Sequence, residues 1–301
     1  MRRPIAVVGA PSSIGIRPYD DGEPRNVDRA PGVLRDRQLV SRLGAIDFGD
    51  VMPPLYRDFA RPAGRARNEK QVHAYSRALA GRIASATCGG RFAVVLGGDC
   101  SIVLGCLLAA RERAGDQVGL AYVDAHADFA TVQESATGSV SGMALALASG
   151  RGDSRLASLA GSKPLVDGRR VALLGRRHRA ARPGPPALQA SSILDLPSST
   201  FDALGPSELA AAALNRVAAP EVRGFWIHLD VDVLNPSEMS AVDSPEPGGP
   251  MIDDLVRVLT PLVQHPLALG LDLSIYDPAL DPDRSCARRL VTLLEKLLTA
   301  P

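Results

Sequence analysis

The sequence lacks the features that mark several large classes of protein. Lys and Arg number 34 against 33 Asp and Glu, so the formal charge of +1 leaves no excess positive charge to bind a polyanion. The longest apolar stretch, around residues 102–110, is far shorter than the ~18 residues that a membrane helix needs. The first residues run into a strand-like segment without the apolar core of a signal peptide. We expect a cytoplasmic protein with a small-molecule substrate and with neither nucleic acid nor a membrane as partner.

Cysteine is also scarce, and internal repeats and charged tails are missing. The four cysteines show neither the close-paired spacing of a metal site nor the density of a disulfide framework: Cys88, Cys100, Cys106 and Cys286. A chain of 301 residues is long enough to bury a substantial core. We therefore predict a single domain over residues 1–301, with surface loops at 20–31 and 176–189.

Short apolar runs alternate with longer helical patterns along the chain. The runs are mostly continuous, which is typical of strands covered on both faces, and lie at 5–8, 92–96, 120–123, 171–174, 225–229 and 268–273. The helical patterns lie at 69–86, 101–113, 207–217, 252–263 and 287–298. Repeated strand–helix–strand order predicts an α/β fold, a three-layer α/β/α sandwich around a mostly parallel sheet.

Three of the predicted strands end in residues capable of chemistry, and such strand ends are where open parallel sheets bind their ligands. After residue 96 come Gly97, Gly98 and Asp99, which favour a tight turn into a helix capped by Asp99. After residue 123, the side chains of Asp124, His126 and Asp128 alternate, so in an extended segment they project from one side. Two carboxylates and an imidazole this close together would repel or desolvate one another unless a cation lay among them. The alternative interpretation is a solvated acidic loop.

The third strand end repeats the acidic pattern. Asp230 and Asp232 stand at alternate positions between apolar neighbours that would bury them, and buried acids need partners. Together the two acidic ends supply four aspartates and a histidine, an oxygen-rich set suited to two divalent ions such as Mn²⁺. Two such ions ~3.5–4 Å apart lower the pKa of bound water and stabilise both the attacking and the leaving groups.

These strand ends resemble, in order, the three metal-binding signatures of the ureohydrolase family of arginases, agmatinases and formiminoglutamases: residues 97–100, 124–128 and 230–232. Residues 9–13 and 31–35 are similar to the family's opening strand and following helix, and residues 243–249 to its Gly-Thr-Pro-x-x-Gly-Gly turn. The resemblance covers nearly the whole chain. It implies an α/β/α sandwich with about eight strands, two Mn²⁺ ions, a homotrimer or homohexamer, and hydrolysis of a guanidino group to urea and an amine.

The resemblance also assigns roles to single residues. Asp124 and Asp232 resemble the carboxylates that bridge the two ions, while His126 and Asp230 resemble further ligands. Asp128 resembles a ligand of the first ion and the group that exchanges protons during hydrolysis, so the expected catalytic residues are Asp128 and His126. The expected substrate-binding residues are Thr137, Ser139, Ser141 and Asp277.

Cys100 stands where the family usually has a histidine ligand. A thiolate is a soft ligand that suits Zn²⁺ or Fe²⁺ better than Mn²⁺, and it must lose its proton to bind. The alternative is a small buried thiol behind the first ion. With Ser101, Cys100 looks like the Cys-Ser pair of Nω-hydroxy-arginine hydrolases from antibiotic pathways.

Three other positions depart from the family. Ser141 replaces the histidine credited with moving protons to the leaving amine, a task for which a hydroxyl is poorly suited. Ile275 replaces the glutamate that pairs with the guanidinium, and Asp277, two residues on, is its candidate substitute. The segment 174–179 has three arginines and His178 in place of acidic residues, which indicates either an anionic substrate end or a solvated basic loop.

A guanidinium is a planar cation that needs acidic or carbonyl partners, so these losses argue against plain arginine or agmatine as substrate. We expect a hydrolase that acts on a guanidino or amidino metabolite, with an N-hydroxylated or otherwise activated guanidine favoured. The alternatives are an amide deacylase on a related fold and a catalytically silent relative with an assembly or sensing role. We interpret His228 as a satisfied core histidine, although its position two residues before Asp230 would also let it face the site.

Overall fold

The computed structural model describes residues 3–60, 64–162, 164–177 and 185–299. The strands in this part of the chain are β1 (Ile5–Gly9), β2 (Ile46–Asp50), β3 (Phe92–Leu96), β4 (Val118–Val123), β5 (Val171–Leu174), β6 (Leu194–Leu196), β7 (Gly224–Asp230) and β8 (Ala268–Ser274). They form one 8-stranded sheet in the order β2-β1-β3-β8-β7-β4-β5-β6, in which every pairing is parallel. The predicted parallel α/β/α architecture is confirmed.

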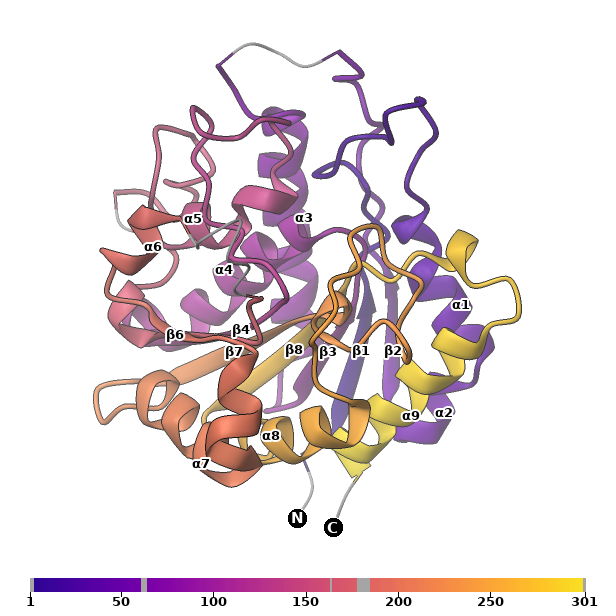
Figure 1. Cartoon of the computed structure of the whole chain (residues 1–301), viewed down its shortest axis with the longest axis vertical. Helices are drawn as coiled ribbons and strands as arrows, with labels where there is room; N and C mark the ends of the chain where they lie inside the picture. Colours follow the sequence, from indigo (N-terminus) through magenta and orange to yellow (C-terminus); the bar gives the residue numbers. More distant parts are fainter. Residues whose placement is uncertain (1–2, 61–63, 163, 178–184, 300–301) are drawn as a thin grey trace.

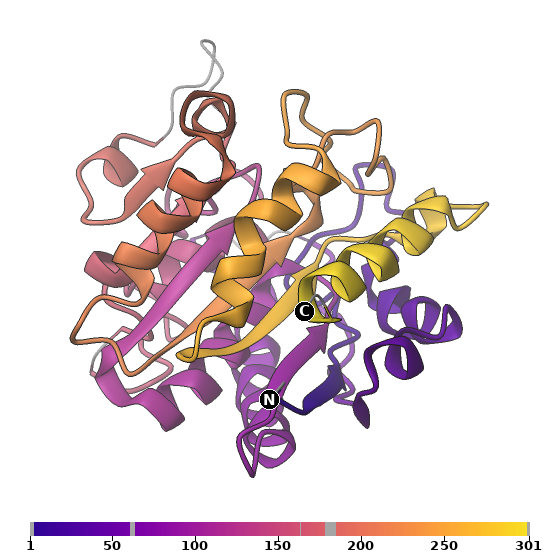
Figure 2. The same ribbon diagram turned by 90° about the horizontal axis from the view of Figure 1, so that it is seen from below.

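Helices cover both faces of the sheet (Figures 1 and 2). On one face lie α3 (Glu69–Ala86), α4 (Val103–Ala114) and α5 (Ala144–Ala148). On the other lie α7 (Ser199–Val217), α8 (Ile252–Gln264) and α9 (Ser285–Thr299), with α1 (Ala30–Asp36) and α2 (Leu39–Leu43) packed beside α9. A short helix, α6 (Pro186–Gln189), precedes β6. Among the described helices, none is long and apolar enough to cross a membrane.

The central strands are the ones that the apolar runs predict. Every residue of β3, β4, β7 and β8 is buried, because helices on both faces exclude water from them. The sequence did not predict β2 and β6, which are the two edge strands. They are short and largely exposed or half-buried, so they need no continuous apolar run.

The helical predictions differ from the structure mainly at their starts. The helix expected at 207 belongs to α7, whose first turns begin at Ser199. Gly205, with φ of 75°, breaks the helical geometry just before Pro206, so the predicted start marks an internal kink. The expected loop 20–31 runs into α1, which begins at Ala30, and the described end of the expected loop 176–189 contains α6.

The order of the strands determines where a site can form. β3, β8, β7 and β4 are consecutive neighbours at the middle of the sheet, and they are parallel. Their carboxyl ends therefore lie side by side, although residues that meet there can be far apart in the chain: Cys100 and Ser274 are separated by 174 positions. This edge of the sheet is the place where α/β proteins bind ligands.

Candidate metal centre and its pocket

Cys100 is held at the carboxyl end of β3 by a tight turn. The Asp99 carboxylate accepts a hydrogen bond of 2.9 Å from a backbone N–H inside the 3-10 turn Cys100–Ile102, as the capping prediction requires. A Cβ added at Gly98 would lie 1.8 Å from the carbonyl oxygen of Ser12, so only glycine fits there. The thiol of Cys100 is consequently buried and fixed in position.

The segment after β4 brings three predicted residues together. The Asp124 side chain is buried, and the Nδ1 atom of His126 lies 2.9 Å from an Asp232 oxygen. Asp128 adopts a φ of +44°, a left-handed conformation that is unfavourable for a residue other than glycine. Its carboxylate accepts a 2.6 Å hydrogen bond from the hydroxyl of Tyr122. The strained backbone therefore turns the Asp128 carboxylate back towards β4.

The end of β7 completes the cluster. The Cys100 thiol donates a hydrogen bond of 2.9 Å to Asp230, joining the ends of β3 and β7. The other Asp230 oxygen accepts the backbone N–H of Asp232, and Asp232 accepts the backbone N–H of Ala125. Backbone donors thus orient both carboxylates, leaving other lone pairs of their oxygens directed at the cluster.

Two groups of side chains in the described part of the chain could each hold a metal ion, with ligand atoms within 4.8 Å of one another. The first consists of Cys100, Asp124, His228 and Asp230, and the second of Asp124, His126 and Asp232. Asp124 is common to both, as expected of a bridging carboxylate. Asp232 belongs to the second group alone, so its bridging role stays a prediction. Asp128 lies outside both groups, bonded to Tyr122.

The carboxylates perturb one another strongly. Burial raises the pKa of Asp124 to about 6, and the charge of Asp232 adds to the effect. Burial and neighbouring carboxylates also raise the pKa values of Asp128 and Asp230 well above the usual range. Burial acts in the same direction on Asp232, but the charge of His126 and the hydrogen bond from it outweigh burial and lower the pKa of Asp232. The cluster therefore has more acidic groups than the protein's own cations neutralise.

The residues present fit divalent cations. Oδ2 of Asp124 is buried and has no hydrogen-bond partner among the described residues, and an orphaned buried oxygen of this kind is costly unless a cation or water satisfies it. Carboxylate and imidazole donors suit Mn²⁺, whereas the Cys100 thiolate would favour a softer ion. The first group contains a sulfur donor, and the second contains only oxygen and nitrogen.

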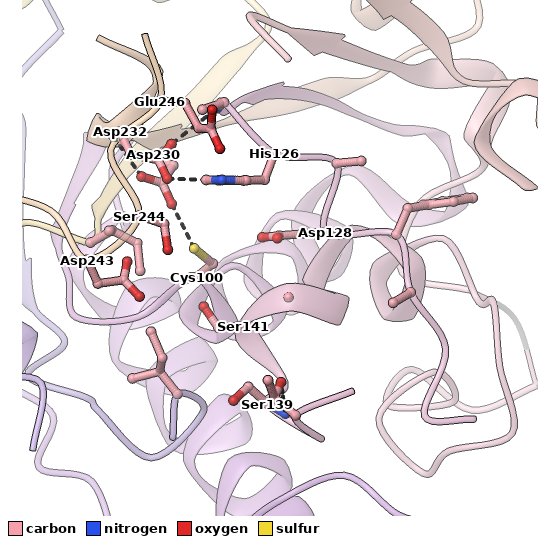
Figure 3. Close-up of a pocket in the computed structure, with 18 of the residues that line it drawn as sticks. Cys100, His126, Asp128, Ser139, Ser141, Asp230, Asp232, Asp243, Ser244 and Glu246 are labelled. Atoms are coloured by element: carbon pink, nitrogen blue, oxygen red, sulfur yellow. Dashed lines mark hydrogen bonds and ion pairs between the residues drawn. The ribbon is translucent and has the colours of Figure 1, made fainter. Parts of the chain in front are cut away.

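A pocket of about 670 Å³ opens at the cluster (Figure 3). Five predicted metal-site residues line it, namely Cys100, His126, Asp128, Asp230 and Asp232. The predicted substrate-binding residues Thr137, Ser139 and Ser141 also line it. The Ser139 hydroxyl accepts a 3.1 Å hydrogen bond from the backbone of Arg17, which ties this wall to the loop after β1.

The segment after β8 does not deliver the predicted substitute carboxylate to the pocket. Asp277 is buried outside the set of pocket-lining residues, and it accepts hydrogen bonds from the backbone N–H groups of Asn26 and Ala279 at 3.0 and 2.9 Å. Ile275 lines the pocket, with a φ of +70°. The position that the family uses for a glutamate thus faces the pocket here with an apolar side chain.

The basic segment reaches the pocket, but its described arginines already have partners. Arg176 and Arg177 both line the pocket. Arg176 forms an ion pair of 2.6 Å with Asp195, and Arg177 donates to the carbonyl oxygen of Gly175 at 2.6 Å. The other two residues of the expected basic patch, at positions 178 and 179, lie outside the described residues.

Sequence reasoning did not single out Asp243, and it favoured a core role for His228 over a position facing the site. Asp243 lines the pocket and forms a 2.8 Å ion pair with Arg25, and its place as the first residue of the family-like turn 243–249 was the available signal. His228 joins the first ligand group instead of packing only in the core. Its signal was the alternation of His228 with Asp230 and Asp232, which places all three on one side while β7 stays extended.

Comparisons with known proteins give one consistent result. A family model described as "Arginase family" matches residues 3–299. The arginase of Bacillus subtilis (strain 168) is 27% identical to this chain over 303 residues, which cover 99% of the chain and 98% of that protein. An arginase of Staphylococcus aureus (strain MSSA476) is 27% identical over 96% of the chain and 95% of its own length. The crystal structure of Bacillus caldovelox arginase superposes with a TM-score of 0.88 at 26% identity, and 99% of each chain is covered.

Proposed function

The chain belongs to the arginase family, and from this premise we propose that it hydrolyses the C–N bond between the central guanidine carbon and the alkyl amine of a guanidino metabolite, releasing the amine and a urea. Its preferred substrate is an N-hydroxylated or similarly activated guanidine, from which the urea product is N-hydroxyurea. The observation that carries the proposal is the pair of ligand groups that share Asp124 below a pocket large enough for such a metabolite. Relatives named arginases over the full length of the chain support the reaction class.

Two divalent ions in these groups, Mn²⁺ or, because of Cys100, Zn²⁺ or Fe²⁺, would polarise the substrate and lower the pKa of water. The chain's own residues supply the proton transfers. Asp128 lines the pocket beside the cluster, and Tyr122 fixes one of its oxygens (Figure 3). Asp128 is thereby positioned to accept a proton from the attacking water and to return it to the departing amine.

The walls of the pocket support an activated guanidine. Ser141 faces the pocket where an imidazole would serve as a proton donor, and a hydroxyl donates a proton far less readily. Ile275 offers no acceptor to a planar cation. An N-hydroxyl group withdraws electrons from the guanidine carbon and lowers the basicity of the group. Attack by water is then easier, and an acidic partner for a full cation is less necessary, so hydrolysis depends less on both missing side chains. A homotrimer or homohexamer and a cytoplasmic location stay predictions.

The test is a product screen with the full-length protein loaded separately with Mn²⁺, Zn²⁺ or Fe²⁺. Urea, N-hydroxyurea and acetate are measured after incubation with arginine, agmatine, Nω-hydroxy-arginine and an acetylated amine. We expect the fastest release to be that of N-hydroxyurea from Nω-hydroxy-arginine. Faster release of urea from unmodified arginine contradicts the substrate preference, and acetate without urea or N-hydroxyurea identifies a deacylase instead.

Two variants sharpen the screen. Asp128→Asn keeps the size of the side chain but removes the proton acceptor, and we expect urea release to fall about 100-fold or more. If every activity and phenotype is unchanged in Asp128→Asn, the protein is a silent relative. Ser141→His restores an imidazole at the pocket wall, and we expect it to raise the rate with arginine relative to the rate with Nω-hydroxy-arginine. The matched control is Glu134→Gln, which removes an exposed carboxylate that pairs with Arg151.

A further inference from the structure

His228 occupies a central position beneath the metal centre. It lies on β7 two residues before Asp230, so both side chains project from the same face of the sheet. Its side chain is 0% exposed. Across the three neighbouring strands β4, β7 and β8, it is in register with Tyr122 on one side and with Asp272 on the other. The Tyr122 ring packs against the imidazole, with the two ring centroids 4.3 Å apart.

Asp272 determines which nitrogen of the imidazole carries the proton. One Asp272 oxygen accepts the indole N–H of Trp226 at 2.6 Å, and the other lies 2.6 Å from Nδ1 of His228. A carboxylate in this position is an acceptor, so Nδ1 carries the hydrogen and Nε2 keeps its lone pair. A histidine that gives one N–H to a carboxylate and offers the other nitrogen as a donor atom is a recurrent arrangement of metal-binding histidines.

The remaining nitrogen of His228 has no partner. Nε2 of His228 is buried and makes no hydrogen bond to the part of the chain that the structure describes. A ring nitrogen of His228 lies within 4.8 Å of ligand atoms of Cys100, Asp124 and Asp230, and Nδ1 is already engaged by Asp272. The unpartnered Oδ2 of Asp124 belongs to the same group. A cation bound between them would satisfy both orphaned atoms.

We propose that Nε2 of His228 is a ligand of the first divalent ion, together with Cys100, Asp124 and Asp230, and that Asp272 orients the ring. The inference deepens the proposed function, because it specifies how that site binds its metal. One imidazole, one thiolate and two carboxylates form a donor set of mixed softness, which suits Co²⁺, Zn²⁺ or Fe²⁺. Co²⁺ is the useful probe, because its visible absorption reports the number and type of its ligands.

The first experiment measures the wild-type, full-length protein loaded with Co²⁺. X-ray absorption at the cobalt edge and a crystal with anomalous scattering from cobalt locate the ion. We expect the ion in the first group at ~2.1 Å from Nε2 of His228, the usual length of a bond between imidazole and such a metal. An ion bound by the carboxylates but separated from Nε2 by a water molecule or by more than ~3 Å overturns the proposal.

The second experiment separates a ligand from a purely structural histidine. In His228→Asn, the amide nitrogen takes the place of Nδ1 and keeps the hydrogen bond to Asp272, whereas nothing replaces Nε2. We expect the metal-free variant to unfold at nearly the wild-type urea concentration, and to bind the first Co²⁺ about 100-fold more weakly with an altered visible spectrum. The matched control, His73→Asn, changes a half-buried histidine of α3 and is expected to leave both properties unchanged.

The outcomes also distinguish this inference from the proposed function. Unchanged Co²⁺ affinity and spectrum in His228→Asn refute the inference even if urea is released. Weakened Co²⁺ binding in His228→Asn supports the inference even if no guanidine is hydrolysed to urea or N-hydroxyurea, in which case only the proposed function fails. If His228→Asn does not fold, the position of cobalt in the wild-type protein decides whether Nε2 of His228 is a ligand.

Discussion

The protein holds its acidic residues in two contrasting ways. At the ends of β4 and β7, burial and neighbouring carboxylates raise the pKa values of Asp124, Asp128 and Asp230. On the surface, the hydrogen bonds of Arg151 to Glu134 and of Arg169 to Asp167 lower the pKa of each acid to about 2. The same functional group is thus disfavoured as an anion at the sheet edge and favoured as an anion on the surface.

The difference is one of charge balance. Each surface acid has an arginine that the chain itself supplies, with N–O distances of 2.7 Å in both pairs. At the sheet edge, three acids with raised pKa values and the Cys100 thiol are buried together. His126 is the cation that contacts Asp124 and Asp232 there. A cluster like this is stable as anions only with added positive charge, which two divalent ions would provide.

The largest expected effect is that of metal on the acidic cluster. An ion that binds only the folded protein and is present at 1,000 times its dissociation constant stabilises the fold by about 4 kcal/mol. We expect Mn²⁺ or Zn²⁺ to raise the urea concentration at the midpoint of unfolding above that of chelator-treated protein. An identical midpoint with and without metal would show that the cluster balances its charge in another way.

Removing the shared ligand should come next in size. In Asp124→Asn, both ligand groups lose a charged oxygen, and we expect metal affinity to fall about 100-fold or more, measured by titration with Mn²⁺ and by metal analysis after dialysis. The control is Asp167→Asn, which changes one of the surface acids that pair with arginine and should leave the metal content unchanged. Full metal content in Asp124→Asn would contradict the assignment of Asp124 to both groups.

In the metal-free protein, the buried acids of the sheet edge and the surface acids should make stability depend on pH with opposite signs. The folded-state pKa of Asp124 is about 6, against an ordinary value of 3.8. The contribution of Asp124 to the free energy of unfolding is therefore greatest below pH 3.8 and is lost as the pH rises through 6. The loss should be roughly 3 kcal/mol. Urea unfolding at pH 4 to 7 checks this by comparing metal-free wild-type protein with metal-free Asp124→Asn, which should show a smaller decrease, because Asp128 and Asp230 still contribute to it while Asp124 does not. Saturating metal should abolish the decrease, and a decrease in the wild type no larger than that in Asp124→Asn would contradict the raised pKa of Asp124.

The smallest effect should be that of a surface pair. The pKa of Glu134 is lowered to about 2 from an ordinary 4.5, so its pairing with Arg151 stabilises the fold above pH 4.5 and is lost as the pH falls towards 2. Half of the Glu134 side chain is exposed, so we expect Glu134→Gln to cost about 0.5 kcal/mol at neutral pH. Urea unfolding at pH 7 measures the cost, and a loss above about 2 kcal/mol would show that this pair is not of the solvent-screened kind.

The sequence allowed the central strands and the metal-centre motifs to be predicted for the same reason. Strands covered on both faces must be continuously apolar, and acids that directly follow such strands stand out against them. Asp124, His126 and Asp230 were found in this way, and the structure brings them together. The edge strands β2 and β6 carry no such signal, since one side of each is open to solvent.

The positions of Asp277 and His228 could not be decided from local pattern. Both follow an alternation that would direct them to the site. The Asp277 carboxylate, however, accepts hydrogen bonds from the backbone N–H groups of Asn26 and Ala279. His228 is oriented by Asp272, which lies 44 positions further along the chain. In each case, the deciding partner comes from another part of the fold, so spacing alone gives no information about it.

By itself, the sequence determined the class of fold, the edge of the sheet that carries the chemistry and most of the side chains found there, because burial and side-chain alternation act along a single strand. Only the tertiary structure decided how these side chains divide into two groups around Asp124, which wall of the pocket is apolar at Ile275, and which nitrogen of His228 is free. Those features depend on distances between neighbouring strands, and the parallel order of the sheet sets these distances when the chain folds.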